Sequence, residues 1–236
     1  MLVVTGGNSG IGVSAAKLFV AEGAKVAITG RNETTLRQVA EALGPGVLAL
    51  QADSNDYPAS QRAFAQIAEQ LGRLSGFFVN AGVGGVTPLG GTAPEAFEEL
   101  VRANFTSAFF TAQAALPQLV DGASLVFNGS VLATLGMPGW SAYGGAKGAV
   151  RAMLRVLASE LAPRRIRVNQ VTPSDTKTPI WTPLAPTAQA QDTLNQRISA
   201  SARPRRSAVW QSRRTPRGPC CFSSRTSRHT SQAPKS

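Results

Sequence analysis

Cysteine and histidine are almost absent from this chain of 236 residues, which holds two cysteines and one histidine. The cysteines, Cys220 and Cys221, are adjacent, and neighbouring cysteines make a poor structural disulfide. His229 has no further ligand at the spacing of a metal site. The composition therefore argues against a disulfide-stapled secreted protein and against a bound metal.

Long apolar runs are also lacking. No stretch approaches the roughly 18 apolar residues that a membrane helix needs. No basic segment or cleavage site accompanies the apolar residues that begin at Leu2, as a secretion signal would require. We therefore expect a cytoplasmic protein without a membrane partner.

Acidic residues are missing from the end of the chain. All 13 Asp and Glu residues lie within residues 1–200, whereas nine of the 24 Lys and Arg residues lie within residues 201–236. This basic tail lacks apolar periodicity, which predicts disorder. It could serve as an arm that binds nucleic acid, but Trp210 and Phe222 are its only aromatic residues, and base stacking needs more. We interpret the chain as a near-neutral body of residues 1–200 and a basic tail, without a nucleic-acid partner.

The body alternates short apolar runs with segments of helical periodicity. Strands are predicted at 2–4, 25–29, 47–50, 77–79, 124–127 and 166–171, and helices at 11–22, 33–43, 58–71, 94–116 and 141–161. Strands that are apolar throughout are typical of a parallel sheet covered on both faces. The sequence therefore predicts an α/β protein with a doubly wound parallel sheet. We expect residues 174–200 to form a loop.

A glycine-rich loop joins the first predicted strand to the first helix. Gly6 permits a tight turn, Gly10 lets a phosphate approach the backbone, and Gly12 lets helix and strand pack closely. The N-terminus of the helix offers free N–H groups to phosphates. The alternative is an ordinary glycine turn, but the position favours a dinucleotide site. Its candidate residues are Thr5, Gly6, Asn8, Ser9, Gly10, Ile11 and Gly12.

Further candidates follow the next three strands, where ligands of open α/β sheets bind. Arg31 stands where an acid would bind the ribose of NAD, and its guanidinium suits the 2′-phosphate of NADP; the alternative is a solvated surface arginine. Asp53, followed by Ser54, could accept a hydrogen bond from adenine or could cap the next helix. The third candidate segment is Asn80-Ala81-Gly82. These positions predict NADP rather than NAD.

Tyr143 and Lys147 are four residues apart on a predicted helix, so their side chains share one face. A tyrosine hydroxyl titrates near about 10, and we expect the lysine ammonium to lower that pKa and so activate Tyr143 as an acid/base. Ser130 ends the fifth predicted strand and could hydrogen-bond the reacting oxygen. A surface Tyr–Lys pair is the alternative, but the glycine loop and Ser130 count against it.

Together these motifs resemble the short-chain dehydrogenase/reductase family, whose fold is of Rossmann type, over about residues 1–180. The resemblance implies that Lys147 also binds the nicotinamide ribose and that Asn104, within a long helix, holds a water in a proton relay. It also implies that Pro173 and Thr178 approach the nicotinamide. Ser174 follows Pro173 where the family usually has glycine, so the backbone there is expected to be disturbed. The resemblance further implies a homo-oligomer.

Family members have a further helix and a seventh strand where this chain has its basic tail. We interpret the tail as an out-of-frame reading of a family C-terminus, because a one-base offset through residues 218–236 can encode an apolar, family-like segment. The N-terminus is short by comparison, and we expect the true start to lie upstream.

Two functions follow from these observations. The first is an NADP(H)-dependent oxidoreductase of a small carbonyl or secondary alcohol substrate, with residues 1–200 as its dinucleotide-binding and catalytic domain. The second is a catalytically impaired dinucleotide-binding protein whose C-terminal lid and subunit interface are lost. An unpaired sheet edge and exposed apolar surface would favour the second function.

Overall fold

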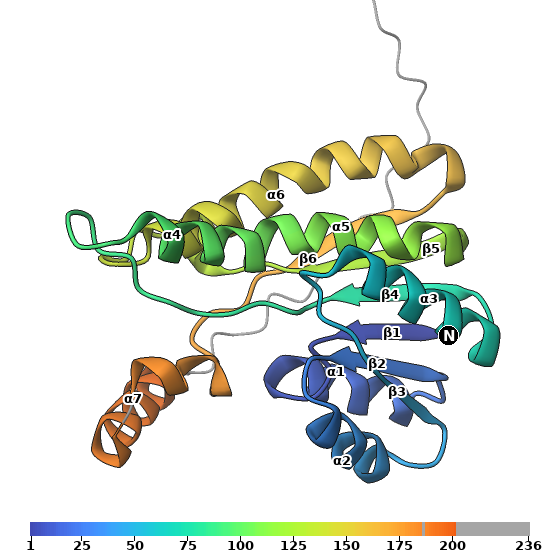
Figure 1. The fold of residues 1–236 in the computed structure, drawn as a ribbon, viewed down its shortest axis with the longest axis horizontal. Coiled ribbons are helices and arrows are strands. Elements are labelled where there is room, and N and C mark those ends of the chain that lie inside the picture. Colours follow the sequence, from blue (N-terminus) through green and yellow to red (C-terminus); the bar gives the residue numbers. More distant parts are fainter. Residues whose placement is uncertain (186, 202–236) are drawn as a thin grey trace, which may run out of the picture. The chain divides into compact units, whose positions relative to one another are not determined.

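The computed structural model describes residues 1–185 and 187–201 (Figure 1). Six parallel strands form one sheet in the order β3-β2-β1-β4-β5-β6. The strands are β1 (Leu2–Thr5), β2 (Val26–Gly30), β3 (Val47–Gln51), β4 (Leu74–Val79), β5 (Leu119–Asn128) and β6 (Arg167–Val171). The helices are α1 (Gly10–Ala21), α2 (Glu33–Leu43), α3 (Tyr57–Leu71), α4 (Pro94–Val101), α5 (Ser107–Ala115), α6 (Ser141–Leu161) and α7 (Ala188–Ser201). The predicted doubly wound α/β fold is confirmed.

Successive residues of each central strand point to opposite faces of the sheet, as the pleat requires. Val3 packs toward α3, α5 and α6, whereas Val4 packs toward α1 and α2. Phe77 and Phe78 divide in the same way between the two cores.

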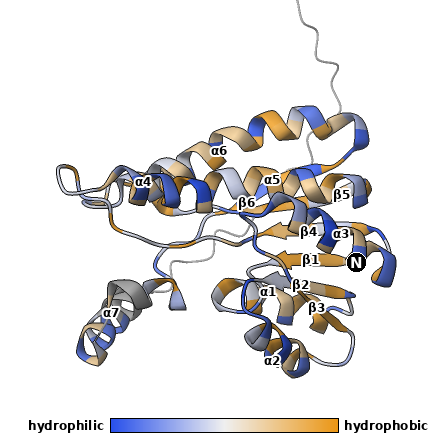
Figure 2. Cartoon of the chain, viewed as in Figure 1, coloured by the Kyte–Doolittle hydropathy of each residue, from blue (hydrophilic) through white to orange (hydrophobic). Residues whose placement is uncertain are grey.

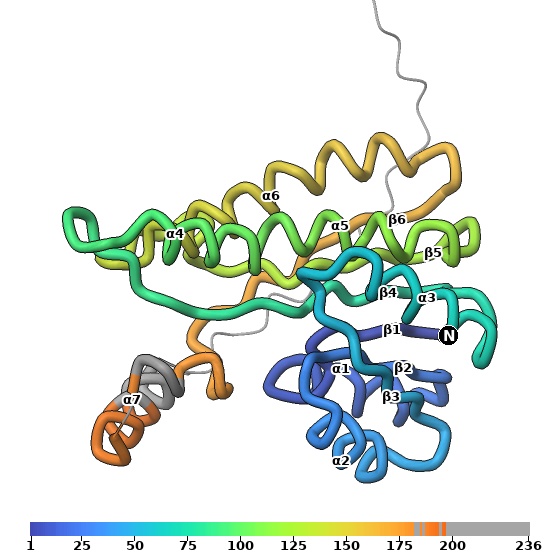
Figure 3. The backbone as a smooth tube through the Cα atoms, viewed as in Figure 1, coloured from blue at the N-terminus to red at the C-terminus, as the bar shows by residue number. Residues whose placement is uncertain are grey.

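Helices cover both faces of the sheet (Figure 1 and Figure 3). The central strands β1, β2 and β4 are almost entirely buried and largely apolar (Figure 2), as expected for strands covered on both faces. The edge strand β6 instead carries Arg167, Asn169 and Gln170 and is partly exposed.

Two strands begin earlier than the sequence pattern predicts. Strand β4 begins at Leu74 and β5 at Leu119, because Gly76 and the pair Asp121-Gly122 interrupt the apolar runs without ending the pairing. The register between β4 and β5 shifts between Leu74 and Gly76. From the sequence alone, a strand cannot be extended past residues that interrupt its apolar pattern. In the structure the strand continues because the neighbouring strand pairs with the residues on both sides of the interruption.

The segment between β6 and residue 201, predicted as a loop, contains a 3₁₀ segment Pro179–Leu184 and the helix α7. The loop prediction is wrong for these residues, since their apolar spacing is too weak to mark a helix. Ser174 follows Pro173 without the expected disturbance: among the described residues, Arg165 is the one non-glycine residue with positive φ.

Residues 202–236 of the predicted basic tail, with its cysteines, histidine and aromatic residues, lie outside the described residues. The domain boundary at residue 200 stays a prediction. Within residues 1–185 and 187–201 no seventh strand is present, and β6 pairs with β5 alone.

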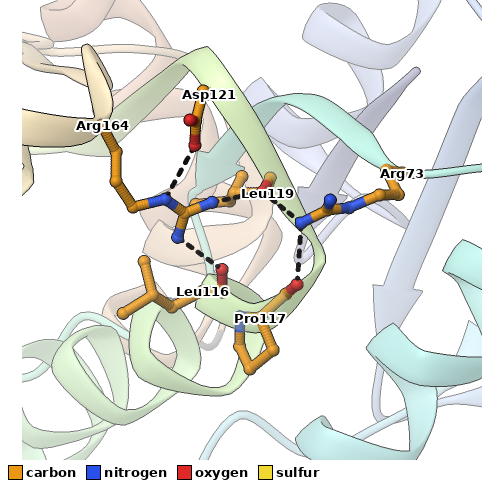
Figure 4. A network of polar contacts seen from close by, with 6 residues as sticks. All are labelled: Arg73, Leu116, Pro117, Leu119, Asp121 and Arg164. Carbon is orange, nitrogen blue, oxygen red and sulfur yellow. Dashed lines mark hydrogen bonds and ion pairs between the residues drawn. The ribbon is translucent and has the colours of Figure 1, made fainter.

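Two arginines hold the turn between α5 and β5, at the end of the sheet away from the glycine loop (Figure 4). The guanidinium of Arg164 donates to the carbonyls of Leu116 (3.2 Å) and Leu119 (2.5 Å) and pairs with Asp121 at 3.0 Å. Arg73 donates to the carbonyls of Pro117 and Leu119. These cations satisfy carbonyls that the end of a helix leaves free, so Arg164 has a structural role.

Candidate active site

The site lies at the carboxyl ends of the strands, where β1 and β4 are neighbours and the chain leaves them in opposite directions. A cavity opens there, and four of its lining residues are glycines, which leave room for a pyrophosphate against bare backbone. Its lining residues are Gly6, Ser9, Gly10, Ile11, Asn80, Ala81, Gly82, Val83, Gly84, Asn128, Thr178, Pro179 and Ile180. The donor set and the space fit a dinucleotide.

The glycine loop has the geometry that its sequence predicts. Gly6 and Gly10 have φ of +61° and +50°, a region that strains other residues. A Cβ on Gly12 would lie 2.1 Å from the Gly6 carbonyl oxygen, so only glycine lets α1 start this close to the turn. A Cβ on Gly10 would lie 3.1 Å from Cβ of Thr178, so Thr178 lies against the glycine loop; its approach to the nicotinamide stays a prediction.

Thr5 and Asn80 hold β1 and β4 together beneath the cavity. The Thr5 hydroxyl accepts from the backbone N–H groups of Asn80 (3.0 Å) and Ala81 (3.1 Å), and it is 1% exposed. The Asn80 amide donates to the carbonyl of Thr5 at 2.9 Å. Both residues were predicted to bind the cofactor; in the structure they shape its cavity, and Asn80 and Ala81 also line it.

The adenosine end of the predicted site is a second hollow beside β2 and β3. It is lined among others by Asn8, Ser9, Arg31, Asp53 and Ser54. Arg31 is exposed, and no acidic group of the described residues lies within ion-pair distance of it.

Polar contacts fix two side chains of this hollow. The Asn8 amide donates to the Thr35 hydroxyl at 2.8 Å. Asp53 accepts from the backbone of Asn55, whereas Asp56 caps α3 through the backbone of Ala59. The alternative that Asp53 caps this helix is therefore wrong.

Tyr143, Lys147 and Ser130 come together at the far end of the dinucleotide cavity. Tyr143 and Lys147 lie one turn apart on α6, and Ser130 follows β5 by two residues. All three are buried, with exposed fractions of 8%, 4% and 7% respectively. The Lys147 ammonium donates to the Asn128 carbonyl at 2.8 Å and lies 5.6 Å from the centroid of the Tyr143 ring. The predicted catalytic residues share one site.

Burial sets the electrostatics of this pair. Desolvation raises the pKa of Tyr143 above its usual 10.0, and a side-chain hydrogen bond with Ser130 offsets part of that rise. Desolvation also lowers the pKa of Lys147 to about 8. The expected lowering of the Tyr143 pKa by the lysine is wrong for the chain alone, because burial opposes the phenolate. At neutral pH Tyr143 holds its proton and can donate it.

Asn104 lies where the predicted helix 94–116 is interrupted. The structure has α4, then a π-helical segment Arg102–Thr106, then α5, so the single long helix was wrong. The Asn104 amide donates to the carbonyls of Val83 and Leu100, both at 2.9 Å, and its oxygen accepts from Val83 N–H at 3.2 Å. A Cβ on Gly82 would lie 2.7 Å from that oxygen. The Asn104 side chain thus positions the segment that lines the cavity, and π-helical turns often mark functional sites.

Asn128 is a site residue that the sequence reasoning missed. Its amide donates to the Asn80 oxygen at 2.9 Å, its carbonyl accepts from Lys147, and its own side-chain oxygen is buried without a partner among the described residues. A polar residue directly after the apolar run Leu125–Phe127 was the available signal.

A second pocket is lined in part by Tyr143 and shares Ile11, Asn128, Thr178 and Ile180 with the dinucleotide cavity. Pro173 also lines this pocket. Its carbonyl accepts a hydrogen bond from Val131 N–H at 3.0 Å, which joins the two lining segments that follow β5 and β6. The remaining walls are Gly129, Ser130, Val131, Leu132, Met137, Trp140, Ser174, Asp175, Thr176 and Trp181. A substrate in this pocket would lie between Tyr143 and the cofactor.

The described residues carry neither a metal-ligand cluster nor a membrane-spanning helix. Across residues 1–185 and 187–201, no three His, Cys, Asp or Glu side chains gather as metal ligands would. The helices of this part are each too short or too polar to cross a bilayer.

Comparison with known proteins places this site in a family. The family model described as "short chain dehydrogenase" matches residues 1–189. An oxidoreductase of Sarocladium schorii is 37% identical over 180 residues, covering 75% of this chain and 72% of that protein. An NADP-dependent (R)-specific alcohol dehydrogenase of Lentilactobacillus kefiri is 32% identical over 185 residues, covering 75% and 73%. A dehydrogenase/reductase structure from Sinorhizobium meliloti superposes with a TM-score of 0.73 at 32% identity, covering 84% and 85%. The chain therefore belongs to the short-chain dehydrogenase family of oxidoreductases.

Proposed function

We propose that this chain is an NADP(H)-dependent oxidoreductase that interconverts a carbonyl compound and a secondary alcohol, with Tyr143 as the general acid/base. The observation that carries the proposal is the adjacency of two pockets: the glycine-lined dinucleotide cavity and the Tyr143 pocket share four lining residues. The nicotinamide cofactor supplies the hydride when bound. A substrate in contact with both pockets can exchange hydride on one side and a proton on the other.

The three buried groups Tyr143, Ser130 and Lys147 each have a part in this proposal. Tyr143, whose pKa burial raises, keeps its proton at neutral pH and donates it to the carbonyl oxygen in the reductive direction. The Ser130 hydroxyl hydrogen-bonds the same oxygen. Lys147 is anchored by Asn128, which lines the cavity. Its ammonium would bind the nicotinamide ribose when the cofactor is present, and it stabilises the phenolate that develops as Tyr143 donates its proton in the reductive direction.

The chain offers a matched test of the acid/base role, because it has two tyrosines. Tyr143→Phe is expected to lower the rate of NADPH oxidation about 10²- to 10⁴-fold while leaving the NADPH-dependent rise in melting temperature intact. Tyr57→Phe is the control, since Tyr57 lies on α3 and accepts a hydrogen bond from Gln113 outside the site. Equal activity of the two variants would remove Tyr143 from the mechanism.

NADP preference is proposed from Arg31 in the hollow beside β2 and β3, and the Lentilactobacillus kefiri relative carries NADP dependence in its name. A ligand that binds only the folded state raises the melting temperature in step with its affinity. NADPH is expected to raise it more than NADH, and Arg31→Leu should remove that difference. Arg37→Leu, on the exposed side of α2, should preserve it. A larger shift with NADH in the native chain would overturn the preference for NADP.

The second candidate, an impaired dinucleotide-binding protein, is favoured by one observation. An apolar groove runs between α1 and the sheet, and Leu18 on its rim is 65% exposed. Its apolar lining includes Leu2, Phe19, Phe77, Phe78, Val126 and Val171. A surface of this kind favours association. Three results together would favour this candidate. The chain would bind an apolar fluorescent dye, NADPH would raise its melting temperature, and no ketone tested would be reduced.

Three further points remain proposals of the same kind: the homo-oligomer, the cytoplasmic location and the out-of-frame origin of the tail. Sedimentation of the purified chain measures the first. Codons after residue 200 that are incompatible with the shifted reading would contradict the last.

A further inference from the structure

The pocket beside Tyr143 has an aromatic wall. The Trp140 and Tyr143 rings meet edge to face, with centroids 5.4 Å apart and planes at 81°. Trp181 meets Trp140 in the same manner at 5.6 Å and 67°. Trp140 lies just before α6 and Trp181 in the 3₁₀ segment after β6, so two distant parts of the chain build this wall. Edge-to-face arrays of this kind accept a further ring at about 4.5–7 Å between centroids.

The polar atom of Trp181 is already engaged. Its indole N–H donates to the Thr176 carbonyl at 2.9 Å, so the ring can offer a ligand only carbon surface and π electrons. Trp140 is 7% exposed and therefore fixed in place by its surroundings. Met137, which also lines the pocket, supplies a polarisable thioether that packs well against rings. The wall thus favours a flat apolar group over a hydrogen-bonding one.

Charge at the pocket excludes another class of substrate. Among the described residues that line it, none is Lys or Arg, and the one charged lining side chain is the exposed Asp175. A carboxylate or phosphate on the substrate would find no Lys or Arg among the lining side chains and would face the acid Asp175. Keto acids and phosphorylated ketones are therefore poor matches for this pocket.

We propose that the substrate is an uncharged aryl ketone, or the corresponding benzylic alcohol, whose ring packs against Trp140 and Trp181 while its oxygen meets Tyr143 and Ser130. This inference rests on the proposed oxidoreductase function. In reduction, the carbonyl carbon accepts the hydride of NADPH and its oxygen accepts the Tyr143 proton. The π bond of the carbonyl breaks, the carbon–oxygen single bond remains, and C–H and O–H bonds form; NADPH is oxidised to NADP⁺, and Tyr143 regains a proton from water.

The experiment compares acetophenone with cyclohexyl methyl ketone, which has the same carbon skeleton but a saturated ring. Steady-state kcat/KM of the full chain is measured with NADPH for both ketones. Trp181→Leu is expected to lower the aryl-to-cyclohexyl ratio of kcat/KM about 2- to 10-fold, the range that one aromatic contact supports. The ratio measured for the variant is divided by the ratio measured for the native chain, so the different intrinsic reactivities of the two ketones cancel. Trp181→Phe keeps a ring and should retain most of the preference.

The matched control is Phe97→Leu, which removes an aromatic ring that is 42% exposed on α4 and does not line this pocket. It should leave the ratio unchanged. An unchanged ratio in Trp181→Leu, with activity retained, would overturn the aryl assignment while the oxidoreductase function stands.

Binding without turnover separates the two proposals. In a Tyr143→Phe chain that also carries Trp210→Phe, the described tryptophans Trp140 and Trp181 report the pocket. Saturable quenching of their fluorescence by acetophenone, weakened by Trp181→Leu, supports the aryl pocket even where no ketone is reduced. Absence of saturable quenching in this variant overturns the aryl pocket, and so does turnover of the saturated ketone alone by the native chain.

Discussion

Replacing Lys147 with methionine should stabilise the fold while it disables the site. Lys147 is 4% exposed, and burial lowers its pKa from 10.5 to about 8. At pH 7 the ammonium is charged in both the folded and the unfolded chain, so the lowered pKa corresponds to a cost of roughly 3 kcal/mol in the folded state. Methionine has a similar length and carries no charge, so it removes this cost.

One interaction opposes the gain. The Lys147 ammonium donates to the Asn128 carbonyl at 2.8 Å, and loss of that bond leaves a buried acceptor without its partner, at about 1–2 kcal/mol. The expected net stabilisation of Lys147→Met at pH 7 is therefore about 1–2 kcal/mol. Urea denaturation of both chains measures it.

The sign of the pH dependence provides a sharper test. Between pH 8 and 10.5 the unfolded lysine keeps its proton and the folded one releases it, so the native chain gains stability as pH rises. Lys147→Met lacks this slope, and its advantage should shrink or reverse at pH 9.5. Lys17→Met, on the exposed side of α1, is the control. A variant that is less stable than the native chain at both pH values would refute the reasoning.

Three further predictions follow from the same structure. Gly12→Ala should destabilise the chain by about 1–3 kcal/mol and abolish the NADPH-dependent melting shift, because its Cβ would lie 2.1 Å from a backbone oxygen; Gly145→Ala, which meets nothing within 4 Å in α6, should instead raise the melting temperature. Arg164→Met should cost about 1–2 kcal/mol in urea denaturation without changing kcat, since its contacts hold the turn in Figure 4; a change in kcat alone would contradict this structural role. The reductive kcat/KM should fall as pH rises through about 8, where Lys147 loses its charge; a profile that is flat to pH 10 would show that this charge does not assist Tyr143.

Many features of this protein could be predicted from its sequence because they depend on local chemistry. Glycines at Gly6, Gly10 and Gly12 predict the loop because positive φ and close backbone approach need a residue without Cβ, and both features are present. The four-residue spacing of Tyr143 and Lys147 predicts one face of a helix because the α-helical period is a local property. The alternation of apolar strands and amphipathic helices predicts the doubly wound sheet for the same reason.

Long-range contacts decided the rest. Burial by the surrounding elements, which no local pattern reports, raises the Tyr143 pKa that the Lys147 spacing alone predicted to be lowered. Asn104 interrupts a predicted helix because its amide bonds Val83, 21 residues away. The sequence could not show that Asn128 belongs to the site, because its contacts with Asn80 and Lys147 are long-range. For the same reason it could not show that Trp181 contacts Trp140. The sequence by itself determined the fold class, most of the elements and the spacing of the candidate catalytic residues. The tertiary structure decided their protonation, their supports and the shape of the pocket, because those depend on which distant residues exclude water from them.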